Sequence, residues 1–474
     1  MGAGVQRRSA FAFIAIAIWL LAIVFVRPLS VDESQYVAAT ALAAKGLLPY
    51  RDYAYLQTPL QPFVFAPLQW LFEGHLLLAM RIANALLSFA TIMFVHGAAR
   101  RIGASEKAAL AAAAMLATCQ SFIWCAGVAR NDVLPAALMA FGLWLIAGGR
   151  NRLVAGVAFG LAASAKISYA VPAAFVFLAA FWTRDTAERR RALAFGAGVV
   201  MGLLPTLLLA AIAPHSFLAE SLVFPARAPT QYYTEIGKAW RLGPVRFLQL
   251  LEAAAVGPAL IAAIEVARRS RAWLGDPVRR AIYAAAVGGL LGAALNKPFQ
   301  IFYLLPALPP LFVLASLALS EARPRWLTGA WALFVVAGLI PPAGWFMRAS
   351  NGLPALDAER RSAALEAALI RQQVDGPVAT LAGQYVANVD ARFAAGPFLY
   401  RTRGFVSPEQ AREWRIVTRD QAATLAEYPP ASIVTGSYPD AQPELEAELA
   451  AQARALSYSP KANAGGFTIW TRRP

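Results

Sequence analysis

The sequence contains few cysteines, few histidines and few charged residues. Its 474 residues include 2 Cys and 3 His, and charged residues make up 15% of the chain. Cys119 and Cys125 are six positions apart in one apolar run, so on a helix they would point to different faces and form no disulfide. His75, His96 and His215 do not have the spacing of metal ligands. These shortages argue against a disulfide-stabilised fold and against a histidine metal centre.

Hydrophobic residues, in contrast, make up 58% of the chain, and the mean hydropathy is +0.51. This composition is too apolar for a soluble globule and predicts an all-α polytopic membrane protein. Apolar segments lie near residues 9–29, 80–99, 106–126, 133–148, 153–182, 192–213, 246–267, 280–296, 299–319 and 326–346. The segment 153–182 exceeds one span and has arginines at both ends, which predicts two short helices that meet near Lys166. With this hairpin, we expect about 11 crossings.

The net charge of +16 does not indicate nucleic-acid binding, because of where the charges lie. Residues 1–346 hold 29 basic and 14 acidic residues, whereas residues 347–474 hold 14 basic and 13 acidic residues. The excess therefore lies in the apolar part, in short clusters between apolar runs. Such clusters mark the cytoplasmic loops of membrane proteins. They are Arg7-Arg8, Arg100-Arg101, Arg150 with Arg152, Arg189-Arg190-Arg191, Arg268-Arg269 with Arg271, Arg279-Arg280, and Arg323 with Arg325.

The composition changes after the last apolar segment, which predicts two domains. Residues 1–346 form a transmembrane domain, and residues 347–474 form a small soluble α/β domain on the membrane face opposite the N-terminus. Helical patterns in the second domain lie near 354–373 and 443–456. Short runs typical of strands are Pro377–Leu381, Ser432–Val434 and Phe467–Thr471.

Six charged residues are candidates for chemistry, because the predicted topology brings them toward the membrane face opposite the N-terminus. Each has an ordinary explanation: acidic residues favour helix starts, loops carry topological charges, and a lysine in an apolar segment can snorkel. Together, however, the cations could hold a lipid phosphate or diphosphate, and a carboxylate could accept a proton from an attacking hydroxyl. The pattern therefore predicts group transfer, and its members are Asp32, Glu33, Arg130, Asp132, Lys166 and Lys297.

The order of the motifs resembles that of the GT-C glycosyltransferases that use polyprenyl-phosphate sugars, notably the protein O-mannosyltransferase and aminoarabinose lipid A transferase group. The resemblance covers most of residues 10–345. It rests on Asp32-Glu33 with Tyr36, Tyr55-x-Gln57-Thr58-Pro59-Leu60, Arg130-x-Asp132, the lysine after Gly160-Leu161-Ala162, and Tyr303-Leu304-Leu305-Pro306-Ala307-Leu308-Pro309. It implies a GT-C-like helical bundle in which Asp32 is the catalytic carboxylate and basic and tyrosine residues line the donor phosphate site. Many relatives have a basic residue where this chain has Gln57 and Thr58, and Lys45 or Arg51 could replace it.

The resulting interpretation is a multi-pass glycosyltransferase of a bacterial inner membrane, with its active site facing the periplasm. Its expected partners are a polyprenyl-phosphate-linked sugar donor, a lipid, glycan or protein acceptor, and membrane lipid, but no nucleic acid. No cofactor is certain, and a divalent cation could assist. Catalysis is assigned to Asp32, Glu33 and Asp132. Substrate binding is assigned to Tyr36, Arg51, Tyr55, Gln57, Arg130, Lys166, Lys297 and Tyr303.

Two other classes of membrane protein fit the composition. A secondary transporter or lipid flippase would have two related halves with ionisable groups near the membrane midplane. A polysaccharide polymerase or ligase would centre on a large late loop. This chain shows no similarity between its halves, and its earliest loop is the richest in charged and aromatic residues, which favours the transferase.

Overall fold

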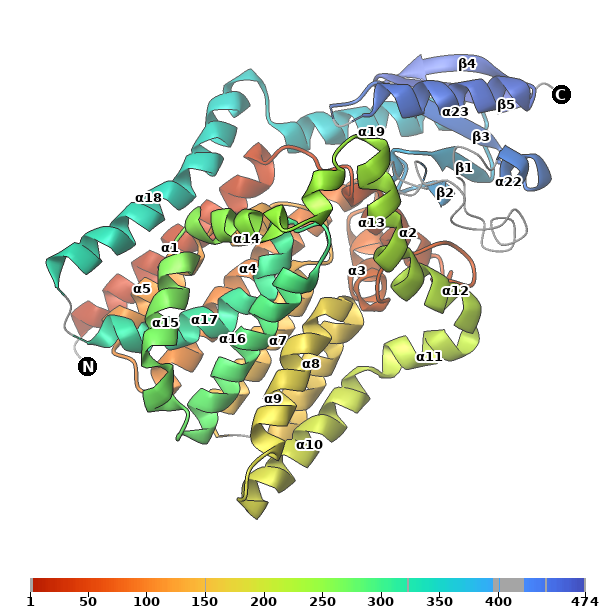
Figure 1. Cartoon of the computed structure of the whole chain (residues 1–474). Coiled ribbons are helices and arrows are strands. Elements are labelled where there is room, and N and C mark those ends of the chain that lie inside the picture. Colours follow the sequence, from red (N-terminus) through yellow and green to blue (C-terminus); the bar gives the residue numbers. More distant parts are fainter. Residues whose placement is uncertain are drawn as a thin grey trace.

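The computed structural model shows a large helical bundle with a small sheet at one end (Figure 1). It describes residues 3–149, 151–321, 324–394, 400, 422–439 and 441–472, so Arg150 and Arg323 of the predicted basic clusters lie outside the described residues. The first part of the bundle contains α1 (Ala3–Val26), α2 (Glu33–Ala44), α3 (Leu60–Leu71), α4 (Leu76–Arg101), α5 (Glu106–Leu116), α6 (Gln120–Ala126), α7 (Val133–Ala147), α8 (Arg152–Ala165) and α9 (Ala170–Phe181). It continues with α10 (Thr186–Gly202), α11 (Leu204–Ile212), α12 (Pro214–Leu218), α13 (Phe224–Glu235), α14 (Val245–Ala255), α15 (Ala259–Trp273), α16 (Pro277–Leu295), α17 (Leu308–Ser320) and α18 (Arg325–Arg348).

The bundle has the helices of a multi-pass membrane protein. Within the described ranges, five helices are long and apolar enough to cross a membrane, and up to eight if each of three bent pairs is one span. The predicted break near Lys166 is confirmed, because α8 ends at Ala165 and a short 3-10 turn leads into α9. The segment 246–267 is not one straight crossing, because α14 and α15 meet at 97° where Gly257, at φ 119°, precedes Pro258.

Two glycine pairs explain why α8 and α10 pack so closely. A Cβ atom on Gly156 would lie 2.0 Å from the carbonyl oxygen of Phe195, and one on Gly160 would lie 2.2 Å from that of Val199. Gly198 and Gly202 face them from α10. Small residues four positions apart let two helix backbones touch, a common solution in membranes, where burial of apolar surface does not drive helix association.

The sheet follows α18 and α19 (Pro354–Arg371) and is mixed, with strand order β2-β1-β3-β5-β4. β1 runs parallel to β2 and β3, and β5 runs antiparallel to β3 and β4. The predicted helices and strands in this region are confirmed. The elements are β1 (Pro377–Thr380), β2 (Asp390–Ala394), α22 (Ala422–Glu427), β3 (Ser432–Gly436), α23 (Pro443–Ala455), β4 (Tyr458–Ala464) and β5 (Phe467–Arg472).

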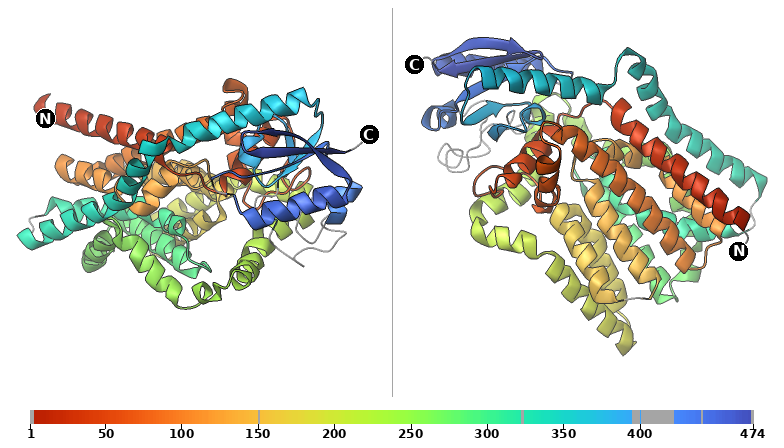
Figure 2. Two further views of the ribbon diagram at one scale, coloured as in Figure 1. Left: turned by 90° about the horizontal axis from the view of Figure 1, so that it is seen from above. Right: turned by 180° about the vertical axis from the view of Figure 1, so that it is seen from behind.

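The sheet region packs directly on the helices that follow the first crossing. Figure 2 shows it at one end of the bundle, while α18 runs beside α1. The Ser34 hydroxyl donates to the Leu381 carbonyl at 3.1 Å and accepts from the Gly383 amide at 2.9 Å. The Gln69 amide donates to the Asn388 side chain at 2.6 Å. These contacts fix the sheet region beside the start of α2.

Candidate functional site

The centre of the candidate site is a cluster of two carboxylates and two cations. The Arg130 guanidinium pairs with Asp32 and, at 2.9 Å, with Asp132, and Lys166 pairs with the other Asp132 oxygen. Burial alone would raise the pKa of the Asp132 carboxyl, but Lys166 and Arg130 hold that pKa below its usual value. The Asp132 side chain is 1% exposed, whereas that of Asp32 is 32% exposed. Asp32 is therefore the carboxylate of the cluster that incoming groups can reach.

The local backbone structure positions each of these side chains in the cluster. Asp32 and Asp132 each occupy the residue just before a helix, α2 and α7 respectively. Lys166 has an extended conformation at the break after α8, which turns its side chain out of the helical path. The neighbouring Asn131 amide donates to the Ala165 carbonyl at 3.0 Å. The Asn84 amide donates to the Arg130 carbonyl at 3.0 Å, so helix α4 also holds the cluster.

Aromatic rings line the cations. The Arg130 guanidinium carbon lies 4.1 Å from the centroid of the Phe302 ring and 5.9 Å from that of Tyr36. The Lys166 ammonium lies 4.7 Å from the Phe302 centroid and 5.6 Å from that of Tyr303. Cations over aromatic faces are stabilised by the ring quadrupoles and keep their charge. Tyr36 and Tyr303, both predicted for substrate binding, thus flank the cluster.

Glu33 follows Asp32 in sequence, but its side chain serves a different interaction. Both Glu33 oxygens bind the Arg81 guanidinium, at 2.6 and 2.8 Å, and both residues are fully buried. The same oxygens accept from the Ala129 and Ser30 amides at 2.7 and 2.8 Å. Burial alone would raise the pKa of the Glu33 carboxyl, but Arg81 keeps it below its usual value. This geometry favours a role in holding the Ala129–Arg130 segment over direct contact with substrate.

The remaining predicted substrate-binding residues lie at different depths. Gln57 accepts from the Asn131 amide at 3.3 Å, and the Tyr55 ring packs edge-on against Tyr36, with 6.3 Å between centroids. Arg51 is exposed and pairs with its neighbour Asp52 at 2.8 Å. Lys297 is exposed after α16, and in the described part of the chain no hydrogen bond or ion pair holds it. The structure thus brings Tyr55 and Gln57 to the cluster, but not Arg51 or Lys297.

Several contacts at the site were not foreseen from the sequence. The Gln300 amide donates to the Tyr233 hydroxyl at 2.6 Å, and the Arg241 guanidinium lies 5.2 Å from the Tyr233 ring centroid. Tyr233 and Gln300 are 67 positions apart in the sequence, and no local sequence pattern predicts their contact. Arg81 is different: a lone arginine at the start of an apolar run is costly in a membrane and so signals a partner.

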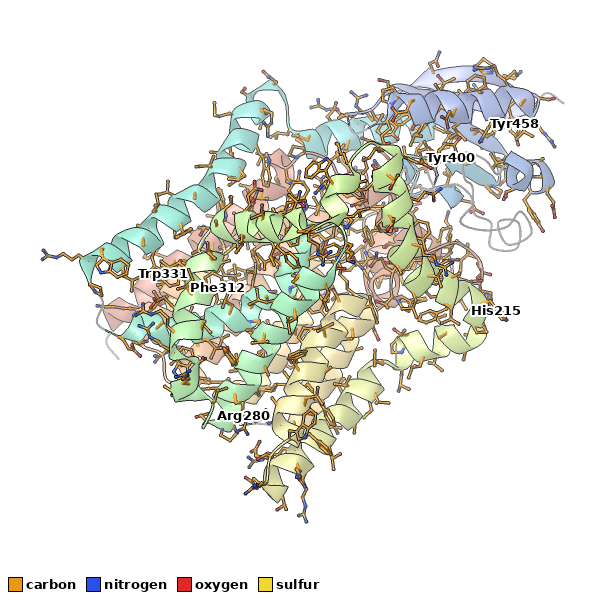
Figure 3. The ribbon with its side chains drawn as sticks, in the orientation of Figure 1. His215, Arg280, Phe312, Trp331, Tyr400 and Tyr458 are labelled. Carbon is orange, nitrogen blue, oxygen red and sulfur yellow. The ribbon has the colours of Figure 1, made fainter. Side chains whose placement is uncertain are left out.

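No ready-made metal centre is present in the described residues, since no group of three or more His, Cys, Asp or Glu side chains is arranged to hold an ion. The histidines are separate from one another. His75 binds Glu359 at 2.7 Å and His96 binds Glu106 at 3.2 Å. His215 lies at the edge of the molecule on α12 (Figure 3). The divalent cation considered above would therefore need ligands from the substrate or from the ion-paired carboxylates.

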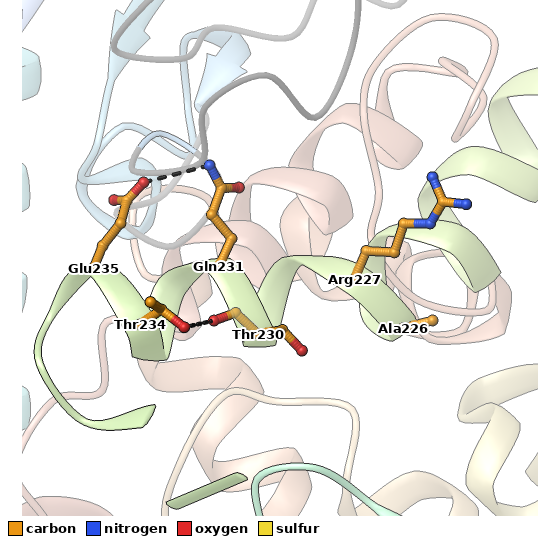
Figure 4. A pocket seen from close by; sticks show the side chains of 6 residues that line it. All are labelled: Ala226, Arg227, Thr230, Gln231, Thr234 and Glu235. Carbon is orange, nitrogen blue, oxygen red and sulfur yellow. Dashed lines mark hydrogen bonds between the residues drawn. The ribbon is translucent and has the colours of Figure 1, made fainter. Parts of the chain in front are cut away.

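A surface cavity of about 510 Å³ lies apart from this cluster, along the exposed face of α13 (Figure 4). Its lining contains no member of the charged cluster. We therefore locate the candidate chemistry by the arrangement of charges rather than by this hollow. The lining residues are Ala226, Arg227, Thr230, Gln231, Thr234 and Glu235.

Known structures share the fold over nearly the whole chain. ArnT from Cupriavidus metallidurans in the apo state is 18% identical, with a TM-score of 0.62 and coverage of 98% of this chain and 99% of that one. The same protein bound to undecaprenyl phosphate gives 17% identity and a TM-score of 0.60, with the same coverage. The oligosaccharyltransferase AglB from Archaeoglobus fulgidus, in complex with an inhibitory peptide and a dolichol-phosphate, is 11% identical, with a TM-score of 0.54 over 100% of this chain and 75% of that one.

The sequence itself identifies the family. No curated protein matches the chain. Residues 55–298, which include Arg130, Asp132 and Lys166, match the model of one sequence family. This match covers more than half of the chain, and the protein accordingly belongs to glycosyltransferase family 87.

Proposed function

We propose that this glycosyltransferase takes its sugar from a polyprenyl-phosphate carrier and transfers it to a lipid, glycan or protein acceptor on the periplasmic face of a bacterial inner membrane. The observation that carries the proposal is the cluster of Arg130 and Lys166 with Asp32 and Asp132. The undecaprenyl phosphate and dolichol-phosphate bound by ArnT and AglB support this type of carrier. Family membership decides against the transporter or flippase alternative.

In the proposed reaction, the acceptor oxygen forms a bond to the anomeric carbon while the bond from that carbon to the phosphate oxygen breaks. The polyprenyl phosphate leaves with the bonding electrons, and Arg130 and Lys166 stabilise its charge. Asp32, the reachable carboxylate, takes the proton of an acceptor hydroxyl or orients that hydroxyl. Asp132 holds both cations in place. If the acceptor is itself a phosphate, little base catalysis is required and Asp32 mainly positions groups.

The other predicted site residues are assigned by their contacts with the charged cluster. We assign the orientation of the donor to Tyr36, Tyr55, Gln57 and Tyr303. Lys297 and Arg51 lie outside the ion pairs, so we assign them to parts of the substrate farther from the phosphate. Glu33 supports the site through Arg81.

The function is tested with purified protein and radiolabelled polyprenyl-phosphate sugars. We expect the protein to consume such a donor and to release the polyprenyl phosphate, and to do so faster when a competent acceptor is added. Consumption of a nucleotide sugar in place of every lipid-linked donor would refute the proposed carrier. This assay also separates the transferase from a flippase, which would move the donor without consuming it.

The proposed topology has about 11 crossings, a cytoplasmic N-terminus and a periplasmic domain after residue 346. Its support is the position of the arginines: the loop before α10 lies at the end of the bundle away from the sheet (Figure 1). Reporter fusions at Arg190 and Gly383 are expected to report opposite sides of the membrane, cytoplasmic and periplasmic respectively. The same localisation for both fusions would overturn the topology.

A further inference from the structure

A buried carboxyl group that takes no part in the proposed reaction lies beside the site. Glu220 belongs to a single π-helical turn, Ala219–Val223, between α12 and α13, and is 1% exposed. One of its oxygens, Oε2, accepts from the Tyr55 amide at 2.6 Å. Its other oxygen, Oε1, has no hydrogen-bond partner among the described residues, and no cation there pairs with it. Isolated π turns inside helices are frequently found at functional sites.

The segment that Glu220 holds is residues 47–59, which we call the tyrosine loop. Tyr50 has a positive φ of 68°, a conformation that costs a non-glycine residue free energy and persists only when neighbouring groups enforce it. The Tyr50 hydroxyl binds the Gln57 carbonyl, and its ring packs edge-on against Phe217 of α12, with 5.2 Å between centroids. The Tyr53 hydroxyl donates to the Ala39 carbonyl at 3.2 Å. The loop is therefore held between α2 on one side and the α12–π-turn segment on the other.

The loop leads directly to the charged cluster. Tyr55, whose amide binds Glu220, packs against Tyr36, and the Tyr36 ring faces Arg130. Two positions later, Gln57 binds Asn131 between the two cluster residues Arg130 and Asp132. A shift of the loop would therefore move both the aromatic wall and the segment that carries the phosphate-binding arginine.

We propose that Glu220 is a positioning residue, which holds the tyrosine loop against the Arg130–Asp132 segment by accepting the Tyr55 amide. Its effect on transfer rests on the proposed function, whereas its effect on the stability of the fold does not. Among the described residues Glu220 forms no hydrogen bond or ion pair with the charged cluster, so its effect reaches the cluster through Tyr55 and Gln57.

The surroundings of Glu220 also determine its protonation. Burial without a cationic partner raises the pKa of the Glu220 carboxyl well above its usual value of 4.5. The titratable groups beside it are the hydroxyls of Tyr50 and Tyr53, while His215 of α12 and Arg227 of α13 are exposed and make no ion pair with it. In the unfolded chain the carboxyl ionises above about pH 4.5. The folded protein therefore loses stability as the pH rises above that value, until the pH reaches the raised pKa.

The test compares Glu220→Gln and Glu220→Ala with the wild type, and uses Glu235→Gln, an exposed carboxyl of α13, as the matched control. Gln keeps the acceptor oxygen and is neutral at every pH, so we expect transfer within about twofold of the wild type at neutral pH. Ala removes the acceptor, and a displaced loop is expected to lower kcat by about tenfold to 100-fold. Normal transfer by Glu220→Ala, or equal losses in the Gln and Ala variants, would overturn the proposal.

A second measurement does not depend on the donor or the acceptor. The melting temperature of Glu220→Gln is expected to exceed that of the wild type by an amount that grows as the pH rises above about 4.5 toward the raised pKa of Glu220, since only the wild type carries the ionisation penalty. Glu235→Gln should follow the wild type at each pH. A difference in melting temperature between Glu220→Gln and the wild type that does not change with pH would show that Glu220 is not protonated in the folded protein. If Glu220→Ala fails to fold, the Gln variant still tests the role of the acceptor oxygen by its transfer rate and the protonation of Glu220 by its melting temperature. The expected melting result together with no donor consumption would refute the proposed function alone.

Discussion

Asp32→Asn is expected to abolish sugar transfer, with a loss of roughly 10²–10⁴-fold in kcat, the range that a general base contributes. Asn has nearly the same shape, but it cannot take a proton and carries no negative charge to pair with Arg130. The fold should change little, because the Asp32 side chain is 32% exposed and the buried Arg130 guanidinium keeps Asp132 as its partner. The measurement is initial rate with a radiolabelled polyprenyl-phosphate sugar, together with thermal melting of the same preparation.

The control for this prediction is Glu73→Gln, an equivalent change at an exposed carboxylate after α3. It should leave both rate and melting temperature unaltered. Full activity in Asp32→Asn would remove Asp32 from catalysis. Lost activity together with a large drop in melting temperature would instead assign Asp32 a role in starting helix α2, which begins at the next residue.

The sequence predicted the charged cluster because burying charge in a membrane is costly. A lysine within an apolar segment requires a partner, and the pairing of Lys166 with Asp132 supplies it. The break after α8 was predictable for a related reason, since a segment of that length with basic residues at both ends cannot be one crossing. Both inferences need only the residues of one segment and the known cost of placing charge in a bilayer. Neither requires knowledge of the tertiary structure.

Glu33 shows which contacts such reasoning does not predict. Its neighbour Asp32 has the same charge and nearly the same position in the chain, yet the next residue of a helix points about 100° away, and Glu33 meets Arg81 of α4. Only the packing of α2 on α4 decides which carboxylate reaches the open side. Tyr233 and Gln300, 67 positions apart, likewise meet through tertiary structure that no local pattern encodes. The exposed Lys297 has the charge expected of a phosphate ligand, but in the described part of the chain it makes no ion pair with the cluster, and sequence order does not show which cations meet Asp132.

Lys166→Met is expected to weaken both the fold and the binding of the donor. Met keeps the apolar stem of the lysine but removes its charge. Asp132, whose side chain is 1% exposed, then retains Arg130 as its cation. Because Arg130 still pairs with Asp132, the loss of stability should be smaller than the about 3–5 kcal/mol that removing the sole partner of a buried charge costs. Loss of one charge-assisted contact to the donor phosphate, worth about 1.5–3 kcal/mol, would raise the donor concentration required by about one to two orders of magnitude. Thermal melting and donor titration measure the two effects separately.

The double variant Asp132→Asn with Lys166→Met tests whether Lys166 binds the donor phosphate or only forms a structural ion pair with Asp132. The neutral amide that replaces the Asp132 carboxylate would carry no charge that needs Lys166, and Arg130 would keep Asp32 as a partner, so part of the lost stability should return and the two single effects should not add. Donor binding should stay weak, because no cation has been restored at position 166. Recovery of donor affinity along with stability would mean that Lys166 serves only to neutralise Asp132.

Lys107→Met, at an exposed lysine of α5, is the control for loss of a cation and should change neither donor affinity nor stability. Unchanged donor titration in Lys166→Met would leave Arg130 as the one cation of the cluster that binds the phosphate.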